Sequence, residues 1–271
     1  MLMDGGIQGN TRNDNSRRKA VIHYHGMPLS GPTQHIGRFL RGRHAFVSFA
    51  APKCLPTVAK NARTFAIDNG AFSAWKRGEV VDWSEYRDFI QQWRYHPGFD
   101  WCVIPDVIDG TAEDNDKMIE QWGLPATISV PVWHLHEPIK RLVWLAGAWP
   151  RVAFGSSGEY AKIGTEAWTD RMHQAMQAVC GIIEGGRPIC KLHGLRMLAK
   201  SIVRRFPFSS CDSTNAARNA AYEQRFKTYP PEEAWQRAET VAWSVESEQS
   251  AECYRKRDKQ RKFDMFDKVP A

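Results

Sequence analysis

Residues 64–73 read Thr-Phe-Ala-Ile-Asp-Asn-Gly-Ala-Phe-Ser, a short apolar run followed by an aspartate and a turn-forming Asn-Gly pair. The same change from a strand-like apolar run to polar or glycine-rich residues recurs along the chain, as expected for buried strands that end in loops. About eight runs of this kind are present. They occupy residues 20–24, 45–49, 64–67, 101–104, 127–133, 151–154, 189–192 and 206–210.

Stretches with helical periodicity lie between several of these runs, at residues 83–93, 137–149 and 168–183. Repeated alternation of strands and helices is typical of a parallel sheet with crossover helices. This number of strands predicts an α/β fold, namely a trimmed (β/α)8 TIM-like barrel. No Gly-x-Gly-x-x-Gly follows the first run, which argues against a dinucleotide-binding fold.

The chain divides into three parts by composition. Residues 19–221 carry the apolar runs and form the predicted TIM-like catalytic barrel, whereas residues 1–18 have almost nothing to bury and are expected to be a mobile tail. Residues 222–271 are predicted to be a helical, basic C-terminal extension, because the stretch 254–262 is rich in Arg and Lys. The net charge of +7 agrees with ordinary solubility and with a polyanionic partner.

Cysteine spacing and hydropathy indicate the compartment. The six cysteines have no paired spacing, which favours a reducing environment. No apolar stretch is long enough to cross a bilayer, so we expect no membrane partner. We therefore predict a cytoplasmic protein, in the host cytoplasm if it is phage-encoded, and expect no cofactor.

Three aspartates follow apolar runs directly: Asp68 after Ala-Ile, Asp106 after Ile-Pro and Asp212 after Ser-Cys. In a barrel the carboxyl ends of the strands converge on one mouth, where catalysis takes place. Paired carboxylates suit chemistry at a sugar anomeric carbon, because one can attack C1′ and another can transfer the proton. The sequence therefore predicts an enzyme whose catalytic residues are Asp212 and Asp68.

Five segments, taken in order, resemble tRNA-guanine transglycosylases. Asp-Asn-Gly-Ala-Phe-Ser at 68–73 is similar to the segment that holds the acid/base aspartate of that family, and Ser-Ser-Cys-Asp-Ser-Thr-Asn-Ala-Ala-Arg-Asn at 209–219 to the segment of its nucleophile. The other three are Ile-Pro-Asp at 104–106, Val-Ala-Phe-Gly at 152–155 and Lys-Leu-His-Gly-Leu at 191–195. The resemblance covers roughly residues 20 to 220 and implies a barrel enzyme of the pentosyltransferase class.

Three further segments bring the chain nearest to the shorter phage-type DNA 7-deazaguanine transglycosylases. They are Tyr-His-Gly-Met-Pro at 24–28, Trp-His-Leu-His-Glu-Pro at 133–138 and Phe-Gly-Ser-Ser-Gly-Glu-Tyr at 154–160. The zinc ligands of the tRNA enzymes have no counterpart, because only Cys253 and no histidine follow Asp212. This difference shifts the expected substrate from tRNA to DNA and predicts no bound metal.

The resemblance implies that guanine in DNA is exchanged for 7-cyano-7-deazaguanine or a derivative through a covalent Asp212–C1′ intermediate, with Asp68 moving the protons. The expected partners are double-stranded DNA with its target base flipped out, the small 7-deazapurine base, and a second copy in a homodimer. The expected substrate-binding residues are Asp106, Asn69, Gly70, Phe72, His134, Gly155, Ser156, His193 and Gly194. The expected nucleic-acid contacts are Arg218, Arg38, Arg41 and Arg43.

Other readings of the same residues stay open. His23 and His25 at the first strand, with His134 and Asp212, could form the centre of a metal-dependent amidohydrolase-like barrel, to which His136 or His193 could add a ligand. A tRNA-guanine transglycosylase and a non-catalytic nucleic-acid binder are the remaining alternatives. The last one predicts that loss of Asp212 or Asp68 leaves function intact.

Overall fold

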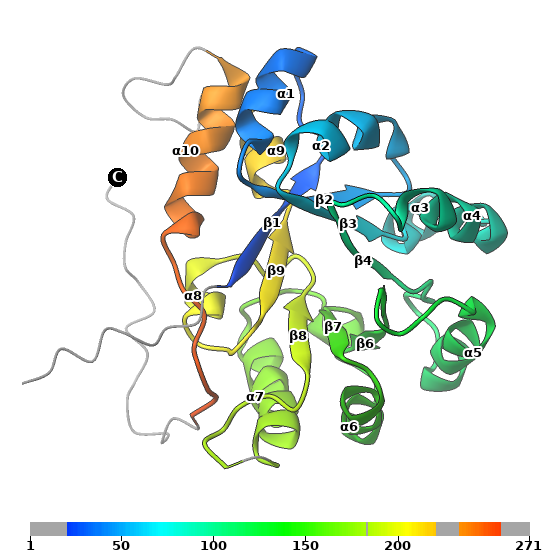
Figure 1. Cartoon of the computed structure of the whole chain (residues 1–271). Coiled ribbons are helices and arrows are strands. Elements are labelled where there is room, and N and C mark those ends of the chain that lie inside the picture. The colour runs from blue at the N-terminus through cyan, green and yellow to red at the C-terminus, as the bar shows by residue number, and fades with distance from the viewer. Residues whose placement is uncertain (1–20, 183, 221–232, 256–271) are drawn as a thin grey trace, which may run out of the picture.

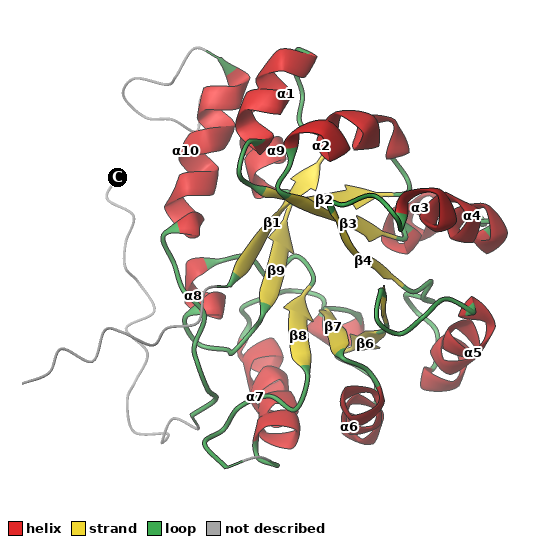
Figure 2. Cartoon of the chain, in the orientation of Figure 1, coloured by secondary structure: helices red, strands yellow, loops and turns green. Residues whose placement is uncertain are grey.

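The structure is a computed structural model that describes residues 21–182, 184–220 and 233–255, so the predicted tail and most of the basic 254–262 stretch lie outside the described residues. Nine parallel strands follow one another in the order β5-β4-β3-β2-β1-β9-β8-β7-β6, with helices around them (Figures 1 and 2). The strands are β1 (Ile22–Met27), β2 (His44–Ser48), β3 (Thr64–Asp68), β4 (Phe99–Val103), β5 (Ser129–Val130), β6 (Val132–His134), β7 (Arg151–Gly155), β8 (Lys191–Gly194) and β9 (Ser210–Ser213).

The sheet closes through a single segment that contains β5 and β6. β5 pairs with β4, whereas β6 pairs with β7, and only Pro131 separates the two halves. Counted as one strand, the segment completes a ring of eight in which every member has two parallel neighbours. The predicted (β/α)8 TIM-like barrel is therefore confirmed.

Helices cover the outside of the ring. They are α1 (Thr33–Leu40), α2 (Leu55–Asn61), α3 (Ala71–Arg77), α4 (Trp83–Trp93), α5 (Ala112–Trp122), α6 (Ile139–Ala148), α7 (Glu166–Cys180), α8 (Lys200–Val203), α9 (Asn215–Ala220) and α10 (Ala234–Glu246), with short 3-10 turns at Pro52–Cys54 and Gly158–Tyr160. The predicted helix at 83–93 is confirmed, and Asp82 caps it by accepting a hydrogen bond from the Ser84 N–H. α6 begins two residues later than predicted because Pro138 is its N-cap.

Side chains that point into the barrel form a separate aromatic core. Tyr24, Phe46, Trp101 and Ala153 are buried there, and the Trp101 indole donates a hydrogen bond of 3.1 Å to the Tyr24 hydroxyl. The alternate residues of the same strands point outward and pack under the helices in two larger apolar clusters. The interior is therefore a packed plug of side chains, so a substrate can bind only at the ends of the strands.

Two strands are placed differently from the sequence prediction, with consequences for the site. The last strand is Ser210–Ser213 rather than 206–210, because Pro207 cannot donate to a ladder and Phe206 and Phe208 pack in an outer cluster instead. Asp212 thus lies within the strand, opposite Tyr24 of β1. β1 continues to Met27, and because Tyr24 points inward, the alternation turns His25 outward.

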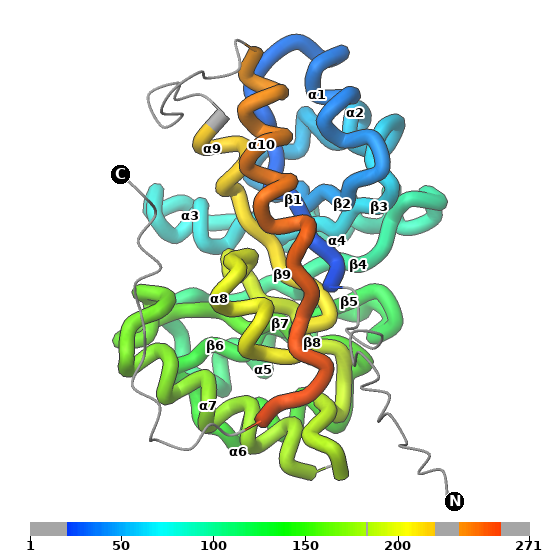
Figure 3. The backbone as a smooth tube through the Cα atoms, turned by 90° about the vertical axis from the view of Figure 1, so that its left-hand side faces the viewer, coloured from blue at the N-terminus to red at the C-terminus, as the bar shows by residue number. Residues whose placement is uncertain are grey.

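α10 belongs to the outer layer of the barrel, where it runs beside α9, α1 and β1 (Figure 3). Glu246 at its C-terminal end lies 2.7 Å from Arg43 Nε and 2.9 Å from His25 Nε2. Burial opposes ionisation of Glu246, but the hydrogen bonds from His25 and Arg43 outweigh it and lower the pKa of this carboxyl to about 2. This polar contact ties α10 to the first two strands.

Within the ranges that the structure describes, no helix combines the length and apolarity needed to cross a bilayer.

We expect the substitution Glu246→Gln to destabilise the protein in a pH-dependent way. The folded-state pKa of about 2 lies below the reference value of 4.5, so the contribution of Glu246 is complete above pH 4.5 and is lost as the pH falls toward 2. Urea unfolding at about pH 7 should show a loss of about 1–2 kcal/mol, which shrinks at about pH 3. Glu239→Gln, at a more exposed partner of Arg43, is the control and should cost less. Equal losses for Glu246→Gln at both pH values would contradict this account.

Candidate active site at the barrel mouth

Asp68, Asp106 and Asp212 meet at the carboxyl end of the barrel. Asp68 ends β3, Asp106 follows β4, and Asp212 lies on the inner face of β9. Burial raises the pKa of Asp68 to about 7, and the negative charges of Asp106 and Asp212 add to the effect. The three carboxyl groups therefore lie at the same end of the barrel, as the sequence predicted.

Asp68 is held in place by two hydrogen bonds to its oxygen Oδ2. The Ser48 hydroxyl and the Gly70 N–H each donate a hydrogen bond of 3.1 Å to that atom. Gly70 has φ of +80°, and an added Cβ would lie 2.9 Å from the Ala50 nitrogen, so only glycine fits this turn. Oδ1 accepts no hydrogen bond from the described residues, which leaves one carboxyl oxygen for a ligand.

Asp106 belongs to a second group of polar side chains. Asn69 Nδ2 donates hydrogen bonds of 2.7 Å to Asp106 Oδ1 and to the Ile104 carbonyl. His134 Nε2 lies 2.9 Å from Asp106 Oδ2, at ion-pair distance. Within the described part of the chain, neither ring nitrogen of the buried His134 has a hydrogen bond of good geometry. His134 is therefore held beside Asp106 at the mouth, with both ring nitrogens buried.

Gly155 makes room for this histidine. A Cβ at position 155 would lie 3.0 Å from His134 Nδ1 and 3.1 Å from Val132 Cγ1. Any larger residue would push the imidazole away from Asp106. The next residue, Ser156, turns its hydroxyl outward, where it accepts a hydrogen bond of 2.9 Å from the Trp168 indole.

Asp212 is held by His193 and by a backbone N–H. The Arg196 N–H donates a hydrogen bond of 2.8 Å to Asp212 Oδ1, and His193 Nε2 lies 3.3 Å from the same oxygen. Burial lowers the pKa of His193 despite the opposing effect of Asp212, so the imidazole is neutral. Its Nδ1 lies 2.8 Å from the Ser210 hydroxyl, which can donate to it and thereby leave the proton on Nε2 facing Asp212.

Arg196 is a site residue that the sequence did not reveal. Its guanidinium carbon lies 4.3 Å from the centre of the Phe72 ring, and Nη2 donates a hydrogen bond of 3.1 Å to the Ser156 carbonyl. Within the described ranges it is also the one non-glycine residue with positive φ, at +58°. No motif marks this position, because Leu-Arg-Met reads as an ordinary loop. Phe72 itself, predicted to bind substrate, lies at the rim.

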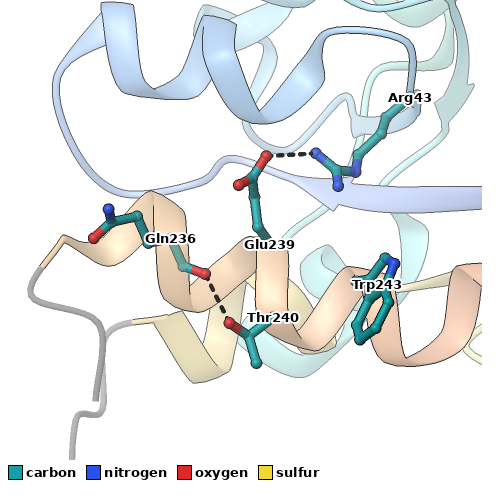
Figure 4. A pocket seen from close by; sticks show the side chains of 5 residues that line it. All are labelled: Arg43, Gln236, Glu239, Thr240 and Trp243. Atoms are coloured by element: carbon teal, nitrogen blue, oxygen red, sulfur yellow. Dashed lines mark hydrogen bonds and ion pairs between the residues drawn. The ribbon is translucent and has the colours of Figure 1, made fainter. Parts of the chain in front are cut away.

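Gly194 and three of the predicted nucleic-acid contacts, Arg38, Arg41 and Arg43, are not brought to the carboxylates. An added Cβ at Gly194 would lie 2.8 Å from Met197 Cβ, in the outer core. Arg43 precedes β2, at the opposite end of the barrel, where it pairs with Glu239 beside a hollow on α10 (Figure 4). Arg38 and Arg41 line a groove between α1 and α2 at that same end. Arg218 lies in α9, directly after the mouth.

The metal-centre alternative is wrong in its geometry. His25 points outward to Glu246 on α10, and His23 shares that outer face by alternation, whereas His134 and Asp212 lie inside the mouth. Among the described residues no group of three or more potential ligands is placed to hold a metal ion.

No family model and no curated protein matches the chain. Among solved structures it is similar to a proposed fructose-1,6-biphosphate aldolase from Coccidioides immitis, with 12% identity, a TM-score of 0.51 and coverage of 84% of this chain and 90% of that one. It is also similar to the tryptophan synthase A-subunit from Pyrococcus furiosus, with 12% identity, a TM-score of 0.47 and coverage of 84% and 97%. Identities this low show the barrel fold alone.

These comparisons overturn the functional assignment made from sequence motifs. The matched barrel with a TM-score of 0.51 is named as an aldolase, not as a transglycosylase, so the transglycosylase resemblance, the guanine exchange in DNA and the glycosyltransferase class were wrong. The DNA-modification and phage attributes are corrected with them. A tRNA transglycosylase and a non-catalytic nucleic-acid binder gain no support either. The motifs were short, and a polar residue at the carboxyl end of a barrel strand is compatible with many kinds of enzyme. DNA, a purine base and a homodimer as partners stay predictions.

We expect Asp68→Asn to raise stability at alkaline pH. The folded-state pKa of about 7 lies above the reference value of 3.8, so between these values the unfolded chain ionises first and the wild type loses stability as the pH rises. The variant removes this loss: its melting temperature should match the wild type at about pH 4 and exceed it by roughly 3–6 °C at about pH 8. Asp82→Asn, at an exposed helix cap, should show no such gain. An Asp68→Asn protein less stable than wild type at alkaline pH would refute the assignment.

Proposed function

We propose that the barrel mouth is the active site of an acid–base enzyme in which Asp68 transfers a proton to and from a small polar substrate. The observation that carries the proposal is the convergence of three carboxyl groups and two buried imidazoles at the open end of a closed barrel. Structural ion pairs alone do not explain this arrangement, because Asp68 has no cationic partner among its strongest interactions. Perturbed acids in a mouth of this kind are typical of catalytic sites.

The roles of the three aspartates follow from their contacts. Asp68 has a free oxygen and a pKa of about 7, so it is able both to donate a proton from Oδ1 and to take one back near neutral pH. Asp212, held by His193 and the Arg196 N–H, supplies a fixed negative charge that stabilises positive charge in the transition state. Asp106, Asn69 and His134 form the side that binds and orients the substrate.

This set of residues favours a substrate that offers N–H or O–H donors, since carboxylates accept hydrogen bonds and attract positive charge. We favour a lyase-type cleavage of a carbon–carbon bond, in which Asp68 first gives its proton to one carbon of that bond and Asp212 stabilises the positive charge that results. The bond then breaks as a substrate hydroxyl on the other fragment becomes a carbonyl, and Asp68 takes back the hydroxyl proton. The aldolase-like barrel, with a TM-score of 0.51, supports this class only by analogy of fold. The free state of all six cysteines supports a reducing, cytoplasmic location.

The proposed function is tested with purified protein and a cellular metabolite extract. Untargeted mass spectrometry should detect at least one compound that wild type consumes and one that it produces. Asp68→Asn and Asp212→Asn should each reduce that conversion by roughly 100-fold or more, since each removes a group that acts in the transition state. Asp82→Asn should convert the compound at the wild-type rate. Conversion that is absent, or that is unchanged by Asp68→Asn, would show the proposal to be wrong.

We expect Gly155→Ala to impair the same conversion through substrate orientation. The added methyl group would meet His134 Nδ1 at 3.0 Å and displace the imidazole from Asp106, so KM should rise about 10-fold or more while the fold is kept. Gly147→Ala is the matched control, because a Cβ at that position of α6 meets nothing within 4 Å. Equal kinetics for both variants would remove His134 from the binding side of the site.

A further inference from the structure

The contact between Arg196 and Phe72 joins opposite sides of the barrel mouth. Phe72 lies in α3, directly after β3, and Arg196 follows β8. When β5 and β6 are counted as one strand, β3 and β8 are four steps apart in either direction around the ring. On one side β2, β1 and β9 lie between them, and on the other side β4, β5–β6 and β7. These two strands are therefore diametrically opposed.

The side chains close this distance by a cation–π contact above the carboxyl groups. The Arg196 guanidinium carbon lies 4.3 Å from the Phe72 ring centre, which is within the range of an attractive contact. Nη2 also donates to the Ser156 carbonyl on the loop after β7. The backbone N–H of the same arginine donates to Asp212 Oδ1. One residue thus links the catalytic carboxylate, the far rim and a neighbouring loop.

The backbone holds Arg196 in this position. Leu195 packs against the interior core and Met197 is fully buried in an outer cluster, so both neighbours are anchored. Between them Arg196 has φ of +58°, a left-handed conformation that is disfavoured for a non-glycine residue. A strained backbone between two anchored residues fixes the direction of the side chain, while the guanidinium itself remains exposed to solvent.

We propose that Arg196 and Phe72 form a clasp across the mouth, and that Arg196 is a positioning residue that decides which molecules reach Asp68, Asp106 and Asp212. A ligand bound at the carboxylates must displace the guanidinium from the Phe72 ring or pass beside it. The exposed face of Phe72 then becomes available to an apolar or planar part of the ligand. This inference rests on the proposed function only in taking the mouth as the active site.

Access to the mouth can be measured without a substrate. Diethyl pyrocarbonate is a neutral reagent that acylates accessible imidazole nitrogens, and His134 lies buried at the mouth with no well-formed hydrogen bond to its ring. Its modification rate is followed by peptide mass spectrometry at about pH 7, the same pH for every variant. His96, which precedes β4 at the other end of the barrel, serves as the internal reference.

We expect Arg196→Ala and Phe72→Ala each to raise the rate at His134 by about 5-fold or more, with no change at His96. Arg196→Lys keeps the charge but loses the planar group, and should fall between wild type and alanine. The double variant should be no faster than the faster single variant, because either substitution alone opens the clasp. Arg77→Ala, at an exposed arginine of the same helix α3, should behave as wild type.

An unchanged rate at His134, a parallel rise at His96, or additive effects in the double variant would each overturn the clasp. The outcome is independent of the metabolite assay, in which Asp68→Asn tests the chemistry. If the variants change the labelling of His134 but the wild type converts no compound, the access role stands and the proposed function is refuted. Turnover with no change in the labelling rate of His134 would support the proposed function and refute the clasp.

Discussion

Residues 129–134 pair with two neighbours at once: the first half joins β4 and the second half, beyond Pro131, joins β7. The Pro131 carbonyl accepts a hydrogen bond of 2.9 Å from the Ala153 N–H, so the proline that interrupts the strand still takes part in the ladder. Closure removes both sheet edges and gives every strand an inner and an outer face. The position of a strand residue in the inward–outward alternation then decides whether its side chain lies in the plug, at the mouth or under the helices.

The plug explains the electrostatics of the mouth. Tyr24, Trp101 and His193 fill the interior with rings whose centres lie 4.7 to 5.9 Å apart. They replace water beneath the carboxyl groups, so little solvent remains to stabilise charge on Asp68. Asp106 and Asp212 have close partners that hold them in place, whereas Asp68 has only a hydroxyl and one N–H. Burial and the two neighbouring negative charges therefore outweigh these hydrogen bonds and raise the pKa of Asp68 to about 7.

The sequence predicted the fold and the meeting of Asp68, Asp106 and Asp212, because an apolar run that ends in an aspartate fixes both a strand and its carboxyl end. The sequence did not predict that His25 points outward. Successive side chains of a strand point to opposite faces, so a shift of one residue reverses the direction. The role of Arg43 was also hidden. Its partner Glu246 lies 203 residues further along the chain and meets it only through the packing of α10. The position of Arg196 depends on its positive φ, which no residue type in the loop predicts.

Charge is distributed unevenly between the two ends of the barrel, and this decides what the net charge can mean. The amino ends of the strands carry Arg43 and, beside the groove between α1 and α2, Arg38, Arg41 and Lys60. The carboxyl ends carry the three aspartates. The net charge of +7 is a sum over the whole chain and therefore does not describe the charge at the mouth. Arg196 brings a guanidinium to the acidic end, where it contacts the Phe72 ring and the Ser156 carbonyl rather than the carboxyl groups.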